Sequence, residues 1–371
     1  MKIVEYHKVN NMSILRDELN TSIIYKSGVN FMVMRVFNFF VVLAFVLQSG
    51  AYAVEIKGAG SKIPESLIQE WGKVYATRFP GTVIKYQASS PADGIKRLIN
   101  KEVDFCSVDT PVSSDELKKN GLLQFPLVLG GISPVVNLPN VSPGQFRLDA
   151  KTLGDIFLGK IKKWDDPEIA ALNPTIKLPQ ADIVVIHRDS PKGVSTIIGE
   201  YLAKSHAEWK ALKGDTMAGT WPASSITVNN PIENFEMIQK TPFSIGYGPV
   251  SVASKDGLQY VKLKNKAGLY ISPSDESISS AATNSKWDES KGYDVILTDQ
   301  IGVSSWPLSM ASFVLVRNSV QDAELRKEAL KFFRYGLRFG MLNASQGGYI
   351  QLPDAVKSMV RSSLDKEIGS K

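Results

Sequence analysis

The sequence predicts an α/β protein built as two lobes, and three observations support this prediction. Short apolar strands alternate with helical segments along most of the chain, as in a parallel sheet covered by helices. Small and polar residues follow several of these strands, at the edge where open α/β sheets bind ligands. Two apolar stretches, 127–138 and 243–248, have the composition of strands by which the chain leaves one lobe and returns to it.

The first 53 residues are predicted to be a leader outside the folded lobes. Residues 34–35 (MR) open an apolar segment, 36–47, that is too short to span a membrane, and residues 51–53 (AYA) fit a signal-peptide cleavage site. We expect cleavage after Ala53 and an exported, periplasmic protein. The polar residues before Met32 do not fit such a leader, and an over-called start codon explains them most simply.

Composition and charge narrow the classes of ligand. The chain has 371 residues, of which 43% are hydrophobic, enough for packed cores in two lobes. Its formal net charge is +6, and removal of residues 1–53, with five basic and three acidic residues, leaves +4. This mild excess of positive charge is not clustered in a stripe of Lys and Arg residues. No nucleic-acid partner is therefore expected, and a small anionic ligand is favoured.

Cysteine and histidine usage argue against two further kinds of site. Cys106 is the chain's one cysteine, so no intramolecular disulfide is possible, and its place in the apolar run 103–108 predicts a buried, unreactive thiol. His187 and His206 lack neighbouring His, Cys or Asp residues at metal-binding spacing. We therefore expect no metal site, and no cofactor.

The first part of the mature chain is predicted to contain three parallel strands whose carboxyl ends meet. Because these ends open on one edge of a sheet, the polar residues that follow them are expected to face one crevice. Those residues are Ser61, Lys62, Ser89, Ser90 and Asp109. The strands are expected at 54–57, 82–86 and 103–108, and the helices after them at 64–74, at 94–100 and from 113 onward.

The remainder of the chain continues this alternation. The apolar residues of 322–339 have the spacing of a long amphipathic helix, and Ala267-Gly268 suits the turn of a hairpin in the polar stretch 254–285. Further helices are expected at 153–158, from 166 and at 194–204, and further strands at 183–186, 243–248 and 311–316.

The stretch 181–202 has the succession of elements that is typical of an anion-binding site. A β-branched run, 183–186, is followed by Arg188, a polar turn and a helix from Val194. A helix N-terminus offers unpaired N–H groups and a partial positive charge, and arginine offers a planar fork of donors. The alternative interpretation is an ordinary strand-to-helix turn with a solvated arginine, and this stretch alone does not decide between them.

Motifs distributed over the mature chain match one known family. They are GAG at 58–60, Val103-Asp104-Phe105 with Asp109, QFPLVLGG at 124–131, LGDIFLGKIKKWDDPEIAALNP at 153–174, IGYG at 245–248, WP at 306–307 and LPDAV at 352–356. With these motifs the chain resembles the periplasmic phosphate-binding protein of the phosphate ABC importer. The block at 153–174 is long and distinctive.

The resemblance implies a two-lobed type II periplasmic-binding-protein fold with two chain crossovers. Lobe 1 is expected at 54–133 and 247–371, and lobe 2 at 134–246. The resemblance also implies a substrate-binding protein, expected to be a monomer and not an enzyme, that closes over phosphate or a related oxyanion in the cleft between its lobes. Its partners in phosphate transport would be the membrane permease and the ATPase of an ABC transporter.

The family's ligand residues are only partly present. Lys62 and Lys192 stand where the family has a threonine and a serine, and Pro91 stands where it has a ligand-binding serine. Val194 replaces a further threonine, so several hydroxyl donors are gone and two lysines have appeared. The predicted ligand-binding set is Asp109, Arg188, Gly193, Lys192, Ser61, Lys62, Ser89 and Ser90.

Several interpretations of this altered site stay open. Asp109 favours a protonated oxyanion such as hydrogen phosphate, because a fully ionised anion would face an unpaired carboxylate. Lys62 and Lys192 favour a larger or more negative ligand, and if they point outward the site binds no anion. Functions of other classes are a binding or sensing protein without transport, and a phosphoester hydrolase in which Lys192 activates Ser195 beside Asp109.

Overall fold

The structure is a computed structural model in which residues 53–371 form one compact unit. The predicted signal peptide and Lys192 lie outside the described residues. No helix among the described residues is both long and apolar enough to cross a membrane. The described residues are 54–188, 193–214, 217, 219, 221–229, 231–318, 323–340 and 348–369.

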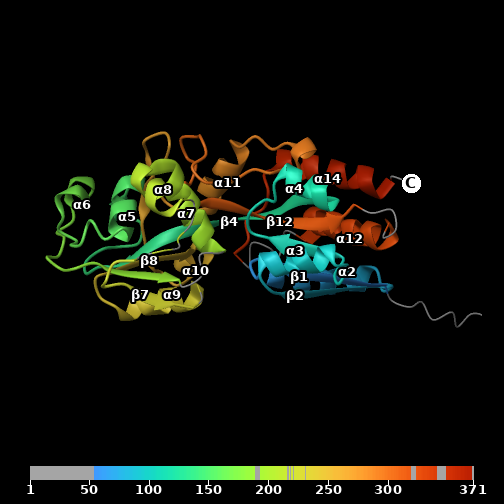
Figure 1. Cartoon of the computed structure of the whole chain (residues 1–371), viewed down its shortest axis with the longest axis horizontal. Coiled ribbons are helices and arrows are strands. Elements are labelled where there is room, and N and C mark those ends of the chain that lie inside the picture. Colours follow the sequence, from blue (N-terminus) through green and yellow to red (C-terminus); the bar gives the residue numbers. More distant parts are fainter. Residues whose placement is uncertain are drawn as a thin grey trace, which may run out of the picture. The chain divides into compact units, whose positions relative to one another are not determined.

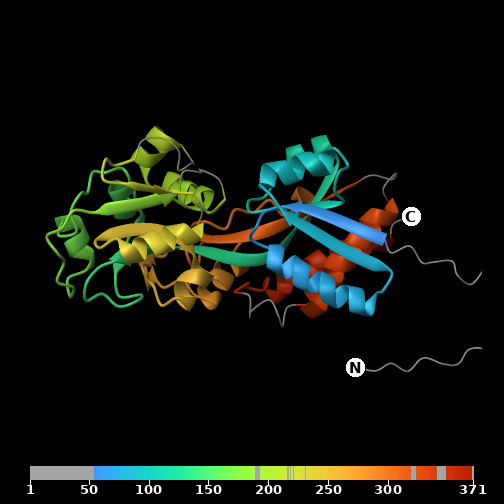
Figure 2. The same cartoon turned by 90° about the horizontal axis from the view of Figure 1, so that it is seen from below.

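One mixed sheet runs through the unit 53–371 (Figures 1 and 2). Its strands, in spatial order, are β2 (Thr82–Ala88), β1 (Val54–Gly60), β3 (Phe105–Val108), β12 (Ser309–Arg317), β4 (Leu122–Asn137), β8 (Ser244–Pro249), β6 (Val184–Arg188) and β7 (Ile226–Val228), with β9 (Gln259–Tyr260) beside β4. The flanks are parallel, since β1 runs parallel to β2 and β3, and β6 runs parallel to β7 and β8. The central strands β12 and β4 are antiparallel to their neighbours.

Helices gather at both ends of this sheet (Figure 1). Around β1–β3 lie α2 (Glu65–Arg78), α3 (Pro91–Ile99), α4 (Ser114–Asn120), η1 (Glu289–Lys291), α12 (Ala323–Tyr335), η2 (Gly336–Gly340) and α14 (Asp354–Gly369). Around β6–β8 lie α5 (Ala150–Phe157), α6 (Pro167–Leu172), α7 (Val194–Ser205), α8 (Ala207–Lys213), α9 (Pro231–Lys240) and α10 (Val250–Lys255). A further helix, α11 (Asp275–Thr283), packs on β4 and β12. This alternation of strands and helices confirms the predicted α/β class.

β4 joins the two ends of the sheet. Its residues 122–131 pair with β12 and its residues 132–137 pair with β8. Most of its side chains are buried, which explains the apolar stretch seen in the sequence at 127–138. The predicted returning strand at 243–248 corresponds to β8, which lies against the second half of β4.

A small second sheet has the order β11-β10-β5, with β5 at Arg147–Leu148, β10 at Lys262–Lys264 and β11 at Tyr270–Ile271. β10 and β11 are antiparallel, which confirms the hairpin predicted near Ala267-Gly268. β10 pairs with β5, and β9 pairs with the second half of β4. The lobe boundaries given above stay a prediction.

Local sequence explains where the helices near the sheet begin. Ser113 caps α4 by accepting a hydrogen bond from the Glu116 N–H, and the Asp166 carboxylate caps α6. α3 begins at Pro91 and not at Gly94 as predicted, because Ser90 is its N-cap and proline is well suited to the first helical position.

Buried aromatic side chains fill the core beside the sheet. The Trp164 indole N–H donates to the Phe243 carbonyl, and the Trp306 indole N–H donates to the Ile132 carbonyl, both at 2.9 Å. Each buried indole therefore packs as a large apolar surface with its polar atom satisfied. Cys106 is fully buried and burial raises the pKa of its thiol to about 12, so the prediction of a buried, unreactive cysteine is confirmed.

Candidate functional site

The carboxyl ends of β1 and β3 place a serine against an aspartate. Ser61 follows β1, and its backbone N–H donates to the Ser107 carbonyl at 2.9 Å, which extends the parallel pairing by one residue. Its hydroxyl donates to Oδ1 of Asp109, the residue that follows β3. Both side chains are buried, at 1% and 7% exposure. The structure thus brings together two of the predicted ligand residues.

Two glycines permit this close approach of the strand ends. Gly60 has φ +123°, and a Cβ there would lie 2.2 Å from the Ser107 carbonyl oxygen. Gly94, in the first turns of α3, would place a Cβ 2.7 Å from the Gly60 Cα. Neither position therefore accepts a larger residue without movement of the backbone. The absence of both side chains seats the N-terminal half of α3 directly on the end of β1.

Asp109 has a perturbed acidity. Its carboxyl is buried, and burial raises its pKa from 3.8 to about 6, because a charge is poorly stabilised away from water. The hydrogen bond from Ser61 and the positive charge of Arg188 act in the opposite direction, and burial outweighs them. Near neutral pH this carboxyl is therefore mainly ionised, but it can hold a proton at a pH only slightly lower.

Arg188 and Gly193 come to the same place from the other end of the sheet. Arg188 is the last residue of β6 and is half-buried, and burial lowers the pKa of its guanidinium while Tyr247 and Asp109 oppose this. Gly193, with φ +66°, is the N-cap of α7. A Cβ at Gly193 would lie 3.6 Å from Arg188 Nη1 and 3.9 Å from Asp109 Oδ2. One guanidinium, one carboxyl and one helix N-terminus therefore share a site, and the positive φ at residue 193 favours glycine there.

The other predicted ligand residues are placed differently. Lys62 is exposed, whereas its neighbour Ser61 is buried. The Ser89 hydroxyl donates to the Ser90 carbonyl at 3.2 Å, and Ser90 is an exposed N-cap whose hydroxyl oxygen accepts from the Asp93 N–H at 3.1 Å. Ligand contacts by Lys62, Ser89 and Ser90 stay a prediction, as does any role of Lys192, which lies outside the described residues.

Sequence reasoning did not identify two buried tyrosines that support this site. The Tyr86 hydroxyl donates to the Ser61 carbonyl at 2.6 Å and contacts the Ser107 hydroxyl, so it fixes the backbone that presents the Ser61 side chain. The Tyr247 hydroxyl lies 3.1 Å from the Ser195 hydroxyl at the start of α7. Tyr247 belongs to the IGYG motif, which was a signal available in the sequence, whereas nothing in the sequence marks Tyr86.

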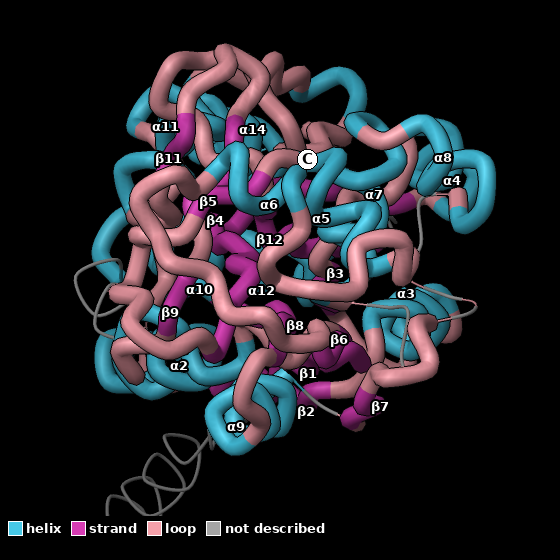
Figure 3. The backbone as a smooth tube through the Cα atoms, turned by 90° about the vertical axis from the view of Figure 1, so that its left-hand side faces the viewer, coloured by secondary structure: helices cyan, strands magenta, loops and turns pink. Residues whose placement is uncertain are grey.

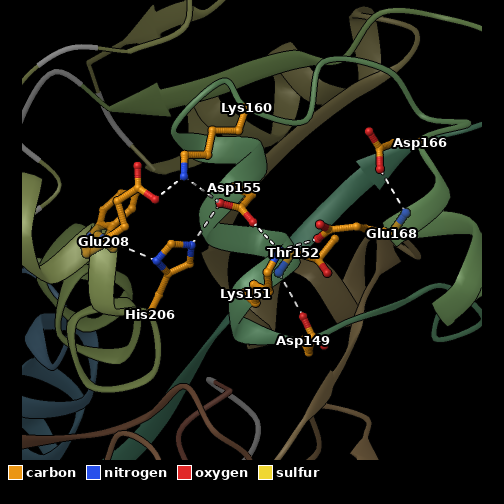
Figure 4. Close-up of polar contacts among 10 residues, drawn as sticks. Asp149, Lys151, Thr152, Asp155, Lys160, Asp166, Glu168, His206 and Glu208 are labelled. Atoms are coloured by element: carbon orange, nitrogen blue, oxygen red, sulfur yellow. Dashed lines mark hydrogen bonds and ion pairs between the residues drawn. The ribbon is translucent and has the colours of Figure 1, made fainter.

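A second polar cluster lies around α5, away from Asp109 and Arg188, and Figure 4 shows its side chains. Asp155 is buried and accepts from Lys151 at 2.8 Å and from His206 Nε2 at 3.1 Å. The Trp209 N–H donates to His206 Nδ1, which makes His206 the N-cap of α8. Lys151 also binds Glu168 and Lys160 binds Glu208, so ion pairs connect α5, α6 and α8. Three residues of the distinctive block at 153–174, Asp155, Lys160 and Glu168, therefore have a structural role in this cluster.

Comparison with known proteins gives a consistent result. The chain matches the model of the PBP superfamily domain over residues 47–337. It is 37% identical over 319 residues to the phosphate-binding protein PstS of Haemophilus influenzae, covering 86% of this chain and 95% of that protein. It is 36% identical over 318 residues to PstS of Pasteurella multocida, covering 86% and 92%.

Solved structures show the same fold at lower identity. An ABC-type phosphate transport receptor from Vibrio cholerae is 17% identical, with a TM-score of 0.55 over 80% of this chain and 99% of that one. The periplasmic phosphate-binding protein PfluDING, solved with phosphate bound, is also 17% identical, with a TM-score of 0.63 over 84% and 94%. The fold is therefore the two-lobed periplasmic-binding-protein fold that the sequence motifs predicted.

Proposed function

Because the chain belongs to the PstS family of phosphate-binding proteins, we propose that it is a substrate-binding protein that captures phosphate for an ABC importer. It binds its ligand without changing it and is not an enzyme. We propose further that it works outside the cytoplasmic membrane after cleavage following Ala53, as a monomer, and that it delivers phosphate to a membrane permease coupled to an ATPase.

The meeting of Asp109, Arg188 and the N-terminus of α7 at Gly193 is the observation that best supports phosphate as the ligand. Arginine presents parallel donors that suit two oxygens of a phosphate group, and a helix N-terminus adds backbone donors and partial positive charge. An ionised Asp109 accepts the proton that hydrogen phosphate carries. Sulfate has no such proton at neutral pH and would set its own negative charge against this carboxylate.

The two lobes of the proposal are 54–133 with 247–371, and 134–246. The change of partner along β4, from β12 up to Gly131 to β8 from Ile132 onward, supports the first boundary. β9 and β10 pair with β4 and β5, so we move residues 259–271 from the first lobe to the second. A structure in which the two lobes rotate relative to each other on ligand binding would test these boundaries directly.

Calorimetric titration of the exported protein with phosphate and with sulfate tests the proposed ligand. We expect phosphate to bind and sulfate not to bind. Arg188→Ala should abolish binding, because it removes the paired donors and leaves Asp109 without its counter-charge. Arg188→Lys is the matched control. It keeps the positive charge but lacks the paired N–H donors of the guanidinium, so it should bind phosphate more weakly than the wild type does.

The same titration with Asp109→Asn tests the role of the carboxyl. An amide carries no charge, so sulfate should now compete with phosphate for the site. The proposal fails if the wild-type protein binds no phosphate, or if Arg188→Ala binds phosphate as tightly as the wild type does.

A further inference from the structure

The small sheet β11-β10-β5 carries cations on one of its faces, and Figure 3 labels its two outer strands, β5 and β11. Lys262 in β10 is paired in register with Arg147 in β5, and Lys264 is paired with Tyr270 in β11. Side chains alternate along a strand, so Arg147, Lys262, Lys264 and Tyr270 share one face. Leu263 points to the opposite face and is fully buried.

On this face of the small sheet, cations outnumber carboxylates. Two cations directly opposite each other on neighbouring strands repel, and Arg147 and Lys262 are such a pair. The ion pairs within 4.0 Å that are formed among the described residues include none of Arg147, Lys262 and Lys264, although burial and, less strongly, the charge of Asp149 raise the pKa of the Tyr270 hydroxyl on this face. The Arg147 guanidinium instead lies 5.4 Å from the centroid of the Tyr270 ring. An anionic partner would relieve this repulsion.

The turn after β10 places apolar side chains next to these cations. The Asn265 side chain accepts from the backbone N–H groups of residues 267 and 269 and donates to the carbonyls of residues 302, 303 and 305. It thereby ties the turn to the loop 301–305. Leu269, Ile301 and Val303 on these two segments are 49%, 57% and 66% exposed, and Lys266 is exposed in the same turn.

We propose that this cationic face and the adjoining apolar tip together form a surface that binds an anionic lipid bilayer. Lysines beside exposed aliphatic side chains suit such a surface, because the ammonium groups meet lipid phosphates while the aliphatic groups enter the headgroup layer. A protein partner is disfavoured, because protein interfaces are depleted in lysine and three of the four cations here are lysines, while Arg147 and Tyr270 already contact each other. The surface lies outside the phosphate site, so the proposal does not depend on the proposed function.

Co-sedimentation with vesicles tests the proposal, using protein purified from the exported fraction. Vesicles of phosphatidylglycerol and phosphatidylcholine in equal amounts are compared with vesicles of phosphatidylcholine alone. We expect binding to the anionic vesicles that weakens as salt is raised. Each lysine near an anionic surface contributes about fivefold to binding. The double variant Lys264→Glu, Lys266→Glu should therefore bind at least about 25-fold more weakly.

Two control variants distinguish binding through this surface from attraction by the net charge of the protein. Lys118→Glu, Lys119→Glu on α4 makes the same change in net charge at exposed lysines elsewhere, and it should bind as the wild type does. Ile301→Asn, Val303→Asn leaves the net charge unchanged and should weaken binding about tenfold through lost apolar contact. Circular dichroism and urea denaturation of every variant should match the wild type, which shows that each is folded.

Three results would overturn the proposal. The first is a wild-type protein that does not bind anionic vesicles. The second is equal loss of binding in the α4 control and in the Lys264, Lys266 variant. The third is binding of all variants to vesicles alike, while only the Lys264, Lys266 variant loses binding to a purified membrane permease; the surface would then recognise a protein.

Discussion

The raised pKa of Asp109 makes a quantitative prediction about stability. Replacement by asparagine keeps the shape of the side chain and an acceptor for the Ser61 hydroxyl but removes the titration. The carboxyl has a pKa of about 6 in the folded protein and 3.8 as an ordinary carboxyl. The folded state therefore holds the proton more tightly than the unfolded chain does, so this group favours folding at low pH and loses that contribution as pH rises from about 4 to 6.

The magnitude follows from the two pKa values. Integrated between pH 4.5 and pH 7.5, the shift removes about 2 kcal/mol from the free energy of unfolding of the wild type. Asp109→Asn has no such loss. The difference in unfolding free energy, variant minus wild type, should therefore increase by about 2 kcal/mol across this range, whatever constant offset the substitution itself produces.

Urea denaturation in phosphate-free buffers at several pH values measures this difference. Subtraction of the two proteins cancels the titration of all groups that they share. If the difference changes by less than about 0.5 kcal/mol, the carboxyl does not titrate near pH 6. Ser61 and Arg188 would then hold it ionised, and burial would not be the dominant influence on its charge.

Three further substitutions test the supports of the site and of the fold. Gly60→Ala should cost about 2 kcal/mol or more in urea denaturation, because φ is positive there and the new Cβ meets the Ser107 carbonyl; unchanged stability would contradict the predicted clash. His206→Ala should cost about 1–2 kcal/mol, since it removes a helix cap and a donor to Asp155, and a loss below about 0.3 kcal/mol would count against both contacts. Tyr86→Phe should weaken phosphate binding about threefold to tenfold in calorimetry with the fold retained, and wild-type affinity would show that its hydroxyl does not position the site.

Much of the fold was predictable because its signals are local. Strands and helices alternate with the expected periodicities, and Ser113 and Asp166 mark helix starts by their side-chain chemistry. α3 begins before the predicted Gly94, because the cap at Ser90 and the proline after it define its start more strongly than its apolar pattern does. The pairing of β9 and β10 with β4 and β5 could not be predicted, since segments of two or three residues give too little pattern to identify a partner strand.

The placement of three predicted site residues at strand ends follows from the sequence, but their contacts do not. Ser61 and Asp109 come directly after β1 and β3, and Arg188 is the last residue of β6, so all three are expected at a sheet edge. The hydrogen bond between Ser61 and Asp109 does not, because it depends on how closely two strand ends approach. The role of the Tyr86 hydroxyl cannot be predicted for the same reason, since its partners are the carbonyl of Ser61, which follows β1, and the hydroxyl of Ser107 in β3.

Lys62 shows how this contact geometry changes the interpretation of the altered motif. From the sequence, Lys62 replaces a hydroxyl donor beside Ser61, and either residue is a candidate to face the ligand. In the structure the Ser61 N–H continues the strand pairing to Ser107, which turns the Ser61 side chain inward and leaves Lys62 exposed. Moving the ammonium inward would desolvate a second cation near Arg188, and this is unfavourable unless an anion of higher charge binds with it. We therefore predict that Lys62 acts on a phosphate ion only through its electrostatic field at the edge of the site, beside the buried Ser61 and Asp109 and the half-buried Arg188.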